Sequence, residues 1–383
     1  MKNIVCLSTS PWFPYPTRKQ QVMSRIKDSR IIYFNPAVTY IARFKDKAAA
    51  KLAKEWKKGA VKAKDNITVY SIPPVIPFFN RCRLINKVNQ KRLSAYVKKV
   101  LKKEGVKDYL LWCYSPTSAD ILPHLDHTGL VYDCVDRHSA YPGFIDPKVV
   151  DGMEKDLAAK ADMVFSTAKG LHEVLSTYNK NSVMIPNGAN FELFYKASMP
   201  SDEKGPLDHI EGPVLGFVGT MQPCIDLDLV ENTARAHPEW TFVMIGSRLP
   251  GAVSESITTC KNVIFTGLVP HDKLPDYVRR FDLCLNLFRH DPLSKDVSPL
   301  KFYEYLATGK PIVSTVMPDQ VLDYEGPVYI ARTEEEFCTL CEKALSENDP
   351  SLTEQRITWG RESSWDSRVA QMENILKNAG LWD

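Results

Sequence analysis

The stretch DVSPLKFYEYLATGKPIVST (296–315) has the pattern of a helix followed by a buried strand. Ser298 is a good N-cap, and Pro299 suits the first helical position because its missing N–H would have no partner there. The segment LKFYEYLA continues the helix as far as Gly309, and the apolar strand PIVST (311–315) follows. A helix leading into a short apolar strand is the repeating unit of an α/β fold with a parallel sheet.

The start of this helix is suited to binding a diphosphate. The backbone amides near Leu300 and Lys301 have no acceptors inside the helix, and the Lys301 ammonium adds a positive charge. Glu304 lies about one turn further along, within reach of a group attached to that phosphate, such as ribose hydroxyls. Asp296 lies eight positions before Glu304, in the loop that enters the helix.

Short apolar segments alternate with helical patterns along the whole chain, which is typical of βα units around parallel sheets. In the first half the expected strands are 3–8, 30–35, 67–72, 109–114, 130–135, 163–167 and 182–187, with helical patterns at 84–104 and 147–161. In the second half they are 214–220, 241–246, 263–267, 283–288, 311–315 and 328–331. The sequence therefore predicts an α/β protein with two doubly wound, Rossmann-like domains, joined by a linker rich in Pro, Gly and charge.

Length and composition agree with two folded domains. The chain has 383 residues, of which 44% are hydrophobic and 25% charged, a balance that excludes wholesale disorder. Mean hydropathy is −0.25, and no run approaches the roughly 18 apolar residues of a membrane span. The opening MKNIVCLSTSPWFP (1–14) has no small-residue cleavage site, so we interpret it as a first strand. Nine scattered cysteines, an odd number, favour reduced thiols in a cytosolic protein.

The ends of the expected strands locate the ligand-binding loops. In doubly wound sheets, ligands bind beyond the carboxyl ends of the strands. The loops in question are 8–21 and 135–143 in the first half and 218–222, 245–248 and 290–311 in the second. We expect a cleft between the two domains to gather all of them.

In combination, these features resemble the retaining glycosyltransferases of the two-domain GT-B fold. The segments IPNGANFELF (185–194) and ADMVFSTAKGLHEVL (161–175) are similar to those before the family's interdomain linker, and SWDSRVAQMENIL (364–376) to its C-terminal helix. The opening also resembles enzymes that build bacterial surface polysaccharides, teichuronic-acid-type transferases among them. The resemblance implies an acceptor-binding domain at 1–195, a linker at 196–212, a nucleotide-sugar-binding domain at 213–355, and a helix at 356–383 that returns to the first domain.

The resemblance implies that the second domain binds a nucleotide-diphosphate sugar, which we expect to be UDP-linked. Glu304 would contact the ribose, the amides at 299–301 the diphosphate, and the loop 267–270 the base. The residues expected to line this site are Gly219, Thr220, Gly246, Arg248, Leu268, Val269, Ser298, Pro299, Leu300, Lys301 and Glu304.

Two features depart from the family pattern. The family's hallmark is a pair of carboxylates separated by seven residues, and its usual first member is Glu, whereas this chain has Asp296 paired with Glu304. Many members also carry Arg and Lys in the loop corresponding to MQPCIDLDL (221–229), which has neither. The diphosphate contact would then pass to Arg248, Lys301 or Arg289.

In the first domain, Asp136 and His138 follow a strand that faces the expected cleft and are candidate catalytic groups. In a retaining reaction no enzyme nucleophile need be evident, and Asp296 would orient the sugar. In an inverting reaction Asp136 or His138 would act as base, whereas Asp133 is interpreted as structural. The expected acceptor or cleft contacts are Trp12, Arg18, Lys19 and Asn187.

Positive charge is concentrated in the first part of the chain. Residues 1–110 contain 25 Lys and Arg against 6 Asp and Glu, although the whole chain has a net charge of only +3. The segment 46–64 has the pattern of a basic amphipathic helix that includes Trp56, and Phe78 and Phe79 follow among arginines. This pattern is typical of binding to a membrane interface, so we expect residues 40–107 to contact an anionic membrane surface.

Two motifs that suggest metal binding have structural interpretations. Asp226 and Asp228 imitate a metal motif, but they open a helix, and N-capping explains them better. Cys338 and Cys341 have zinc-ligand spacing without a second pair, and we interpret them as half-buried thiols on a helix. We expect neither a catalytic metal nor a cofactor.

The leading hypothesis is a glycosyltransferase that moves a sugar, with retention, to a lipid-linked glycan or polysaccharide acceptor. It would work in the cytoplasm, held at the inner face of the plasma membrane. The alternatives are an inverting enzyme resembling GT-B glucuronosyltransferases and a nucleotide-sugar 2-epimerase on the same fold. A nucleic-acid-binding role for residues 40–107 would leave the second domain unexplained, and we expect no nucleic-acid partner.

Overall fold

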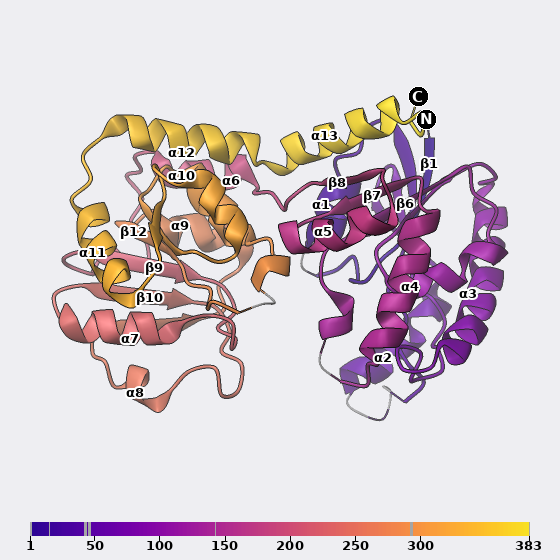
Figure 1. Ribbon diagram of the computed structural model, residues 1–383, viewed down its shortest axis with the longest axis horizontal. Helices are drawn as coiled ribbons and strands as arrows, with labels where there is room; N and C mark the ends of the chain where they lie inside the picture. Colours follow the sequence, from indigo (N-terminus) through magenta and orange to yellow (C-terminus); the bar gives the residue numbers. More distant parts are fainter. Residues whose placement is uncertain are drawn as a thin grey trace. The chain divides into compact units, whose positions relative to one another are not determined.

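The chain folds into two compact units in the computed structural model (Figure 1). Unit 1 comprises Met1–Ile185 together with Val369–Asp383, and unit 2 comprises Pro186–Arg368. The structure describes residues 2–14, 16–41, 44, 47–141, 143–291 and 294–382, with only the backbone of 47–49 and 52.

Unit 1 is built on an eight-stranded sheet with the order β3-β4-β2-β1-β5-β6-β7-β8. All neighbouring strands are parallel except β3, which pairs antiparallel with β4. The strands are β1 Lys2–Leu7, β2 Ser29–Phe34, β3 Ala60–Lys64, β4 Ile67–Tyr70, β5 Leu110–Cys113, β6 Gly129–Cys134, β7 Met163–Ser166 and β8 Ser182–Met184.

The main helices of unit 1 are α1 Arg18–Met23, α2 Lys47–Glu55, α3 Arg83–Glu104, α4 Pro147–Lys160 and α5 Lys169–Tyr178. Apolar residues of α3, α4 and α5 share one core with the sheet, which fixes these three helices on the same face. The helix α13, Trp365–Asn378, begins in unit 2 and continues into unit 1, where Val369, Met372 and Leu376 are buried.

Unit 2 is built on a six-stranded parallel sheet with the order β11-β10-β9-β12-β13-β14. Its strands are β9 Val214–Val218, β10 Thr241–Ile245, β11 Val263–Gly267, β12 Leu283–Asn286, β13 Ile312–Thr315 and β14 Tyr329–Ala331. Its helices are α6 Phe191–Tyr195, α7 Leu227–Ala236, α8 Glu255–Thr258, α9 Leu274–Val278, α10 Leu300–Thr308, α11 Glu334–Leu345 and α12 Pro350–Glu362. One core joins α7 and α11 to the sheet, and a second joins α6, α9 and α10, so the sheet is covered on both faces.

The expected α/β class with two Rossmann-like domains is confirmed, and each expected strand is present, but one helix prediction was wrong. The helix expected over 46–64 ends with a 3-10 turn at Lys58, and Ala60–Lys64 forms β3 instead. Gly59 breaks the helix with a φ of 82°, which allows the chain to turn back along β4. Residues 42, 43, 45 and 46 lie outside the described residues.

The division between the units falls at Ile185 and Pro186, ten residues before the boundary expected at 195. The reason is α6, which packs with α10 in the second core of unit 2. No helix among the described residues is long and apolar enough to cross a membrane. All nine cysteines are described, and none forms a disulfide.

Candidate functional site

Hydrogen bonds hold helix α10 at its middle and at its C-terminal end. The backbone N–H of Val218, at the end of β9, donates to Tyr305 Oη at 2.7 Å. At the C-terminal end of α10, the buried Arg356 donates from Nε to Gly309 O at 2.9 Å, and its Nη1 donates to Pro327 O at 2.7 Å. Because α10 follows the parallel strand β12, its N-terminus lies toward the carboxyl edge of the sheet, where ligands of such folds bind.

The first turn of α10 differs from the prediction in its cap. The helix begins at Leu300, Pro299 occupies the N-cap position, and no side chain caps it. Ser298 precedes the N-cap position, and its Oγ accepts from the backbone N–H of Asn187 at 2.9 Å. Asn187 also donates from Nδ2 to Ser298 O at 3.0 Å, so it positions the loop that enters α10. Leu300 and Lys301 keep amides without intrahelical acceptors, as at any helix start.

Glu304 of α10 is the buried centre of a polar cluster. Its side chain is 1% exposed, and its two oxygens contact His271 Nε2 at 2.8 Å and Lys301 Nζ at 2.6 Å. Burial alone would raise the pKa of this carboxyl, but Lys301 and His271 outweigh burial and lower it. Glu304 is therefore ionised at neutral pH and fixed in orientation.

The loops that follow β9 and β10 touch closely at two glycines. Gly219 donates from its N–H to Ile245 O at 2.8 Å, and Thr220 Oγ1 lies 3.3 Å from Ser247 Oγ. Gly246 has a φ of 143°, and a Cβ added there would lie 2.0 Å from Gly219 O. Only glycine fits this position, and the contact brings the two loops together beside α10.

We expect Gly246→Ala to destabilise the protein by about 3 kcal/mol or more, because both the backbone conformation and the Gly219 carbonyl exclude a side chain. Denaturant unfolding would measure this. Gly251→Ala is the matched control: Gly251 also has a positive φ, of 75°, but nothing lies within 4 Å of its added Cβ. Gly251→Ala should lower the free energy of unfolding by only about 1–2 kcal/mol, the cost of the strained backbone conformation. Equal losses in the two variants would contradict the contact.

The other expected donor-site residues differ in accessibility. Arg248 is exposed, with its guanidinium 5.3 Å from the Phe265 ring centroid, and Leu268 is 76% exposed beside a half-buried Val269. Arg289 forms ion pairs with Asp226 at 3.2 Å and Asp228 at 2.7 Å. Asp226 occupies the N-cap position of α7 but makes no side-chain cap hydrogen bond, so the expected N-capping is not seen and the two aspartates pair with Arg289 instead.

Asp296 ends a short 3-10 helix, Ser294–Asp296, and is buried. Gln320 Nε2 donates to Val297 O at 2.9 Å and so ties the loop to the 3-10 helix Asp319–Tyr324. The loop that carries Asp296 thus leads directly into α10. Its role toward the donor sugar remains a prediction.

In unit 1, two of the expected acceptor contacts belong to the packed interior. Arg18 forms a buried ion pair from Nε to Asp133 Oδ1 at 3.0 Å, with side chains 2% and 0% exposed. Trp12 is buried with its ring edge-on to Tyr33, at a centroid distance of 4.9 Å. The structure therefore does not support Trp12 and Arg18 as acceptor contacts, whereas it agrees with a structural Asp133.

Lys19, Asp136 and His138 lie near one another around Tyr114. Lys19 is buried with Nζ 5.7 Å from the Tyr114 ring centroid, and burial lowers its pKa although Asp136 and Asp133 oppose this. Asp136 Oδ2 accepts from Tyr141 Oη at 2.8 Å. His138 Nε2 lies 3.1 Å from Tyr114 O and must donate to it, which leaves Nδ1 with the lone pair.

We expect His138 to stay neutral well below pH 6. Burial lowers the pKa of His138 to about 4, and the nearby Lys19 acts in the same direction, although Asp136 opposes them. Two-dimensional NMR of imidazole-labelled protein should therefore show a midpoint near pH 4, against about 6.5 for an exposed imidazole. His138→Gln would identify the resonance. A midpoint near 6.5 would contradict the desolvation of this half-buried side chain.

His138 and Tyr141 line a cavity of about 240 Å³ within unit 1. Its wall is mainly apolar, with Phe34, Ile72, Phe79 and Leu93, and polar side chains of α3 and the 3-10 helix Pro116–Asp120 complete it. Ser8 and Asn35, at the carboxyl ends of β1 and β2, also contribute to the lining. An apolar pocket with a few polar groups is the usual form of a small-ligand site.

Comparisons with known proteins show the family to which the chain belongs. Residues 212–347 match the family described as "Glycosyl transferases group 1". TuaH of Bacillus subtilis (strain 168), which is named as a teichuronic acid biosynthesis glycosyltransferase, is 30% identical over 274 residues, covering 66% of this chain and 67% of TuaH. The chain is a group 1 glycosyltransferase.

Solved structures show that this glycosyltransferase has the GT-B fold. Sucrose-phosphate synthase from Thermosynechococcus elongatus matches with a TM-score of 0.68 at 15% identity, covering 99% of each chain. Anabaena HepE, in complex with UDP and glucose, matches with a TM-score of 0.67 at 14% identity over 98% of this chain and 99% of HepE. An α,α-trehalose-phosphate synthase from Burkholderia vietnamiensis matches with a TM-score of 0.71 at 11% identity, covering 99% of this chain and 97% of the synthase.

Sequence reasoning did not identify two residues of the Glu304 cluster in this glycosyltransferase. His271 contacts Glu304, and Phe194 of α6 lies with its ring centroid 5.5 Å from the His271 ring and 5.7 Å from Lys301 Nζ. His271 directly follows the loop 267–270 that is expected against the base, and this position is its only signal. Phe194 comes from a segment more than 70 residues away in sequence, so no local pattern indicates it.

Proposed function

We propose that this glycosyltransferase transfers a sugar from a UDP-sugar to a lipid-linked glycan acceptor at an anionic membrane surface, with retention of configuration. The observation that carries the proposal is the buried, ionised Glu304 one turn from the free amides of Leu300 and Lys301. A carboxylate so placed can accept hydrogen bonds from two ribose hydroxyls while the helix start binds the diphosphate. TuaH, named for teichuronic acid biosynthesis, supports a cell-surface glycan as product.

The donor half would promote transfer by stabilising the departing diphosphate. The α10 amides and the Lys301 ammonium provide fixed positive charge where negative charge develops, and such electrostatic stabilisation contributes most of the rate enhancement in many enzymes. Asp296 would orient the donor sugar. The proposal includes no cofactor and no metal in the transfer step, because this positive charge is already supplied by the chain.

A retaining outcome is favoured over the inverting alternative by the state of His138. With a pKa of about 4, this imidazole is a weak base at neutral pH, and Asp136 already accepts a hydrogen bond from Tyr141. His138 Nδ1 would instead accept a hydrogen bond from an acceptor bound in the cavity of unit 1. We assign that cavity to the acceptor glycan because its mixed apolar and polar wall suits a sugar ring.

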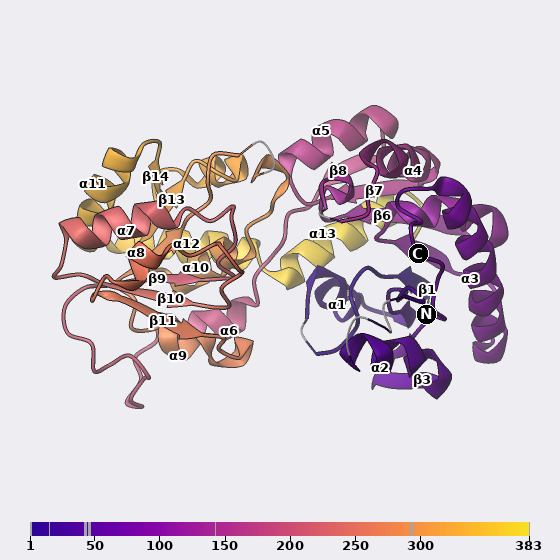
Figure 2. The same ribbon diagram turned by 90° about the horizontal axis from the view of Figure 1, so that it is seen from below.

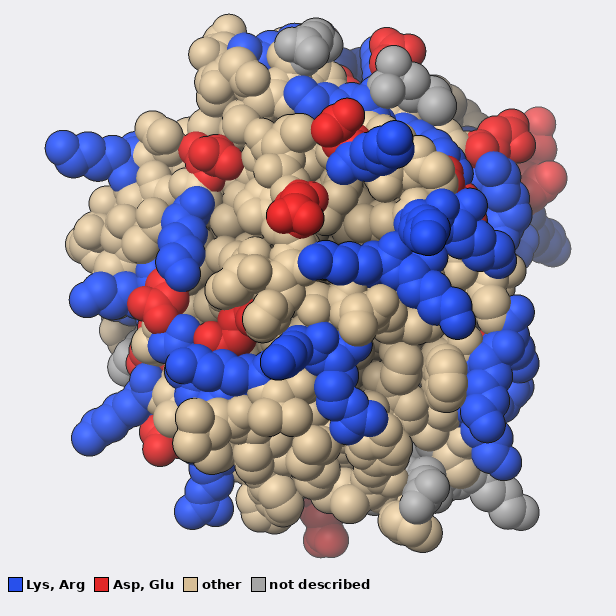
Figure 3. All heavy atoms as spheres, turned by 90° about the vertical axis from the view of Figure 1, so that its right-hand side faces the viewer, with Lys and Arg blue, Asp and Glu red and all other residues tan. Residues whose placement is uncertain are grey.

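A membrane-facing surface is supported by α3 and its neighbours. We define the α3 surface by the exposed cations Lys87, Lys91, Lys98, Lys99, Lys102 and Lys103 and the exposed apolar residues Leu84, Val88, Phe78 and Phe144. Phe78 and Phe144 contact each other with their ring centroids 5.3 Å apart. On the face of unit 1 that Figure 3 shows, Lys and Arg side chains outnumber Asp and Glu.

Trp56, by contrast, does not fit the expected role of a membrane anchor. It is half-buried with its ring edge-on to Tyr96, at a centroid distance of 6.4 Å. We therefore assign the apolar contact with lipid to Leu84, Val88, Phe78 and Phe144. The enzyme would work at the cytoplasmic face of the plasma membrane, where anionic lipids attract such cations.

A screen of nucleotide sugars tests the proposal directly. We expect slow hydrolysis of one UDP-sugar by purified enzyme without acceptor, undiminished after exhaustive EDTA treatment. With bacterial membranes added, the labelled sugar should pass into the lipid-extractable fraction, and NMR of the product should show the anomeric configuration of the donor. Label that stays in the aqueous phase would contradict the lipid-linked acceptor, release of a free 2-epimer would favour the epimerase, and an inverted anomer would contradict retention.

A further inference from the structure

Three potential metal ligands lie close together in unit 2: the imidazole of His237, the thiol of Cys338 and the carboxylate of Glu342. We propose that they form a zinc-binding site separate from the donor site. His237 Nε2 lies 3.3 Å from Cys338 Sγ and 3.5 Å from Glu342 Oε1, and the three ligand atoms all lie within 4.8 Å of one another.

These separations match a tetrahedral zinc ion. With Zn–N and Zn–O bonds of about 2.1 Å and a Zn–S bond of about 2.3 Å, tetrahedral angles place N and S about 3.6 Å apart and N and O about 3.4 Å apart. The observed 3.3 and 3.5 Å therefore require only small side-chain adjustments. Three protein ligands leave one position for water.

The helix α11 supplies two of the ligands from one face. Cys338 and Glu342 are four residues apart, so their side chains lie one above the other. Cys341 points the other way and is fully buried in the core shared with α7. The Cys-x-x-Cys spacing is therefore not a ligand pair, and the thiol at 338 is combined with a carboxylate instead.

The imidazole of His237 is already oriented as a metal ligand would be. Its Nδ1 contacts Glu239 Oε1 at 2.9 Å, which directs Nε2 toward Cys338 and Glu342. A carboxylate on the second nitrogen of a metal-binding histidine is a common arrangement in zinc proteins. The ring also stacks on Trp240, with centroids 3.7 Å apart and an interplanar angle of 6°.

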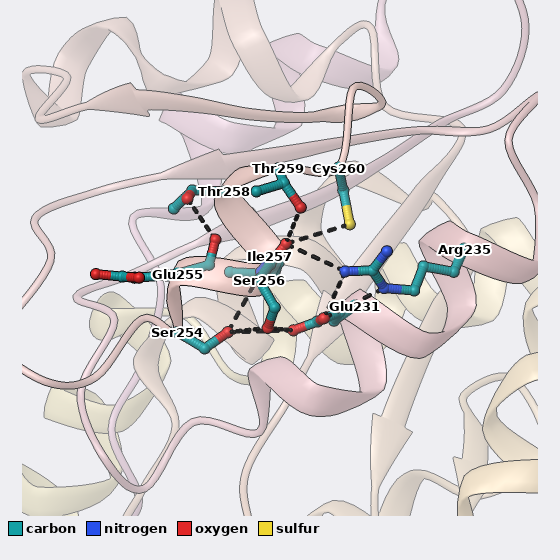
Figure 4. Close-up of polar contacts among 9 residues, drawn as sticks. All are labelled: Glu231, Arg235, Ser254, Glu255, Ser256, Ile257, Thr258, Thr259 and Cys260. Carbon is teal, nitrogen blue, oxygen red and sulfur yellow. Dashed lines mark hydrogen bonds and ion pairs between the residues drawn. The ribbon is translucent and has the colours of Figure 1, made fainter.

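The backbone around His237 is fixed as well. Asn262 Nδ2 lies within 3.1 Å of the carbonyl oxygens of Ala234, His237 and Trp240. Six residues before His237, Glu231 of α7 accepts from Arg235 and from the hydroxyls of Ser254 and Ser256, which ties the helix to α8 (Figure 4). A histidine held this firmly loses little conformational entropy when it binds a metal ion.

The site would join α7 to α11 on one face of the unit 2 sheet. These helices lie side by side in Figures 1 and 2, and Asn232 of α7 donates to Glu334 of α11. His237 follows the C-terminus of α7, which is at the amino edge of the parallel strands, whereas α10 begins at the opposite edge. Zinc here would stabilise unit 2 without contacting the donor nucleotide.

Zinc binding by the untagged full-length protein tests the proposal. After removal of metal with a chelator, Zn²⁺ is titrated in competition with a chromophoric zinc indicator, and we expect one zinc per chain. Co²⁺ should give the charge-transfer absorption of a thiolate–cobalt bond. Cys338→Ser and His237→Gln should each weaken zinc binding at least a hundredfold, and Glu239→Gln about tenfold through the imidazole.

Matched controls are Cys224→Ser, which removes a half-buried thiol elsewhere in unit 2, and Glu335→Gln on the exposed side of α11. Both should bind zinc as the wild type does. Glu342→Gln removes a proposed ligand at a position that is 56% exposed, so this change should not unfold the protein. Failure of the wild type to bind zinc, or equal binding by Cys338→Ser, would overturn the proposal and leave a cluster held by hydrogen bonds alone.

Discussion

Replacing Glu304 with glutamine is expected to weaken binding of UDP about a hundredfold. The carboxylate would otherwise accept two charge-assisted hydrogen bonds from the ribose, and the loss of charge reduces both. Thermal shift or calorimetric titration with UDP measures the change. At a UDP concentration 100 times the wild-type Kd, the stabilisation of about 2.7 kcal/mol should fall to roughly 0.4 kcal/mol in the variant.

The same substitution changes the stability of the unliganded protein, because Lys301 and His271 lose their charged partner. Because the pKa of Glu304 is lowered by folding, the ionised carboxylate stabilises the folded protein fully above its unfolded pKa of about 4.3. This stabilisation is lost as pH falls through the pKa that Glu304 has in the folded protein. Glu304→Gln should remove this part of the acid sensitivity. We therefore expect a lower unliganded Tm at pH 7 and a smaller difference from wild type in strong acid.

Glu231→Gln is the matched control for the nucleotide experiment. Glu231 is also a hydrogen-bonded glutamate on a helix of unit 2, with Arg235, Ser254 and Ser256 as partners (Figure 4), but it lies on α7, which packs in a different core from α10. Its UDP affinity should equal that of wild type. If Glu304→Gln binds UDP as tightly as Glu231→Gln does, the assignment of the ribose contact is wrong.

Reversing three charges on the α3 surface is expected to abolish binding to anionic vesicles. Each cation near an anionic leaflet contributes about 1 kcal/mol, so changing Lys87, Lys91 and Lys98 to Glu should remove at least 3 kcal/mol, a reduction of more than a hundredfold in partitioning. Co-sedimentation with phosphatidylglycerol vesicles measures this. Binding of the wild type should fall as salt rises, since exposed charges are screened, while the part due to the apolar residues persists.

The matched control reverses three exposed lysines of unit 2, at positions 204, 261 and 343, which changes net charge equally. That variant should sediment with the vesicles as wild type does, and the α3 variant should retain its UDP affinity. If the wild type ignores anionic vesicles, or if both triple variants lose binding equally, the α3 surface is only a solvated face.

The strands and α10 were predictable because their signals are local. Apolar runs of four to six residues with helical patterns between them mark each βα unit, and Gly309 and Pro311 mark the end of α10. The strand β3 was missed because AVKAK (60–64) is exposed on nearly its whole length and lacks a buried apolar side. Its pairing with β4 depends on a turn at Gly59 that follows a helix-forming stretch.

The contacts of the candidate site were less predictable because they are not local. The sequence shows Arg18 as a cation in a loop near the strand ends, but its buried partner, Asp133, is 115 residues away. Likewise Ser298 has the residue type of an N-cap, but it precedes the N-cap position, and its Oγ accepts from Asn187, 111 residues earlier. The types of residue at the site follow from sequence, whereas their pairing follows from the fold.

The path of α13 has a consequence for biosynthesis. Unit 1 is completed by Val369–Asp383. Lys27 N–H, in the first segment of unit 1, donates to Glu373 Oε1, in the second, at 2.8 Å. A ribosome releases these residues only after it has made all of unit 2. Residues 1–185 therefore cannot make their contacts with 369–383 while unit 2 is being translated. Val369, Met372 and Leu376 cover apolar surface that stays open until then. The nascent chain therefore offers chaperones an exposed patch on unit 1 throughout the synthesis of unit 2.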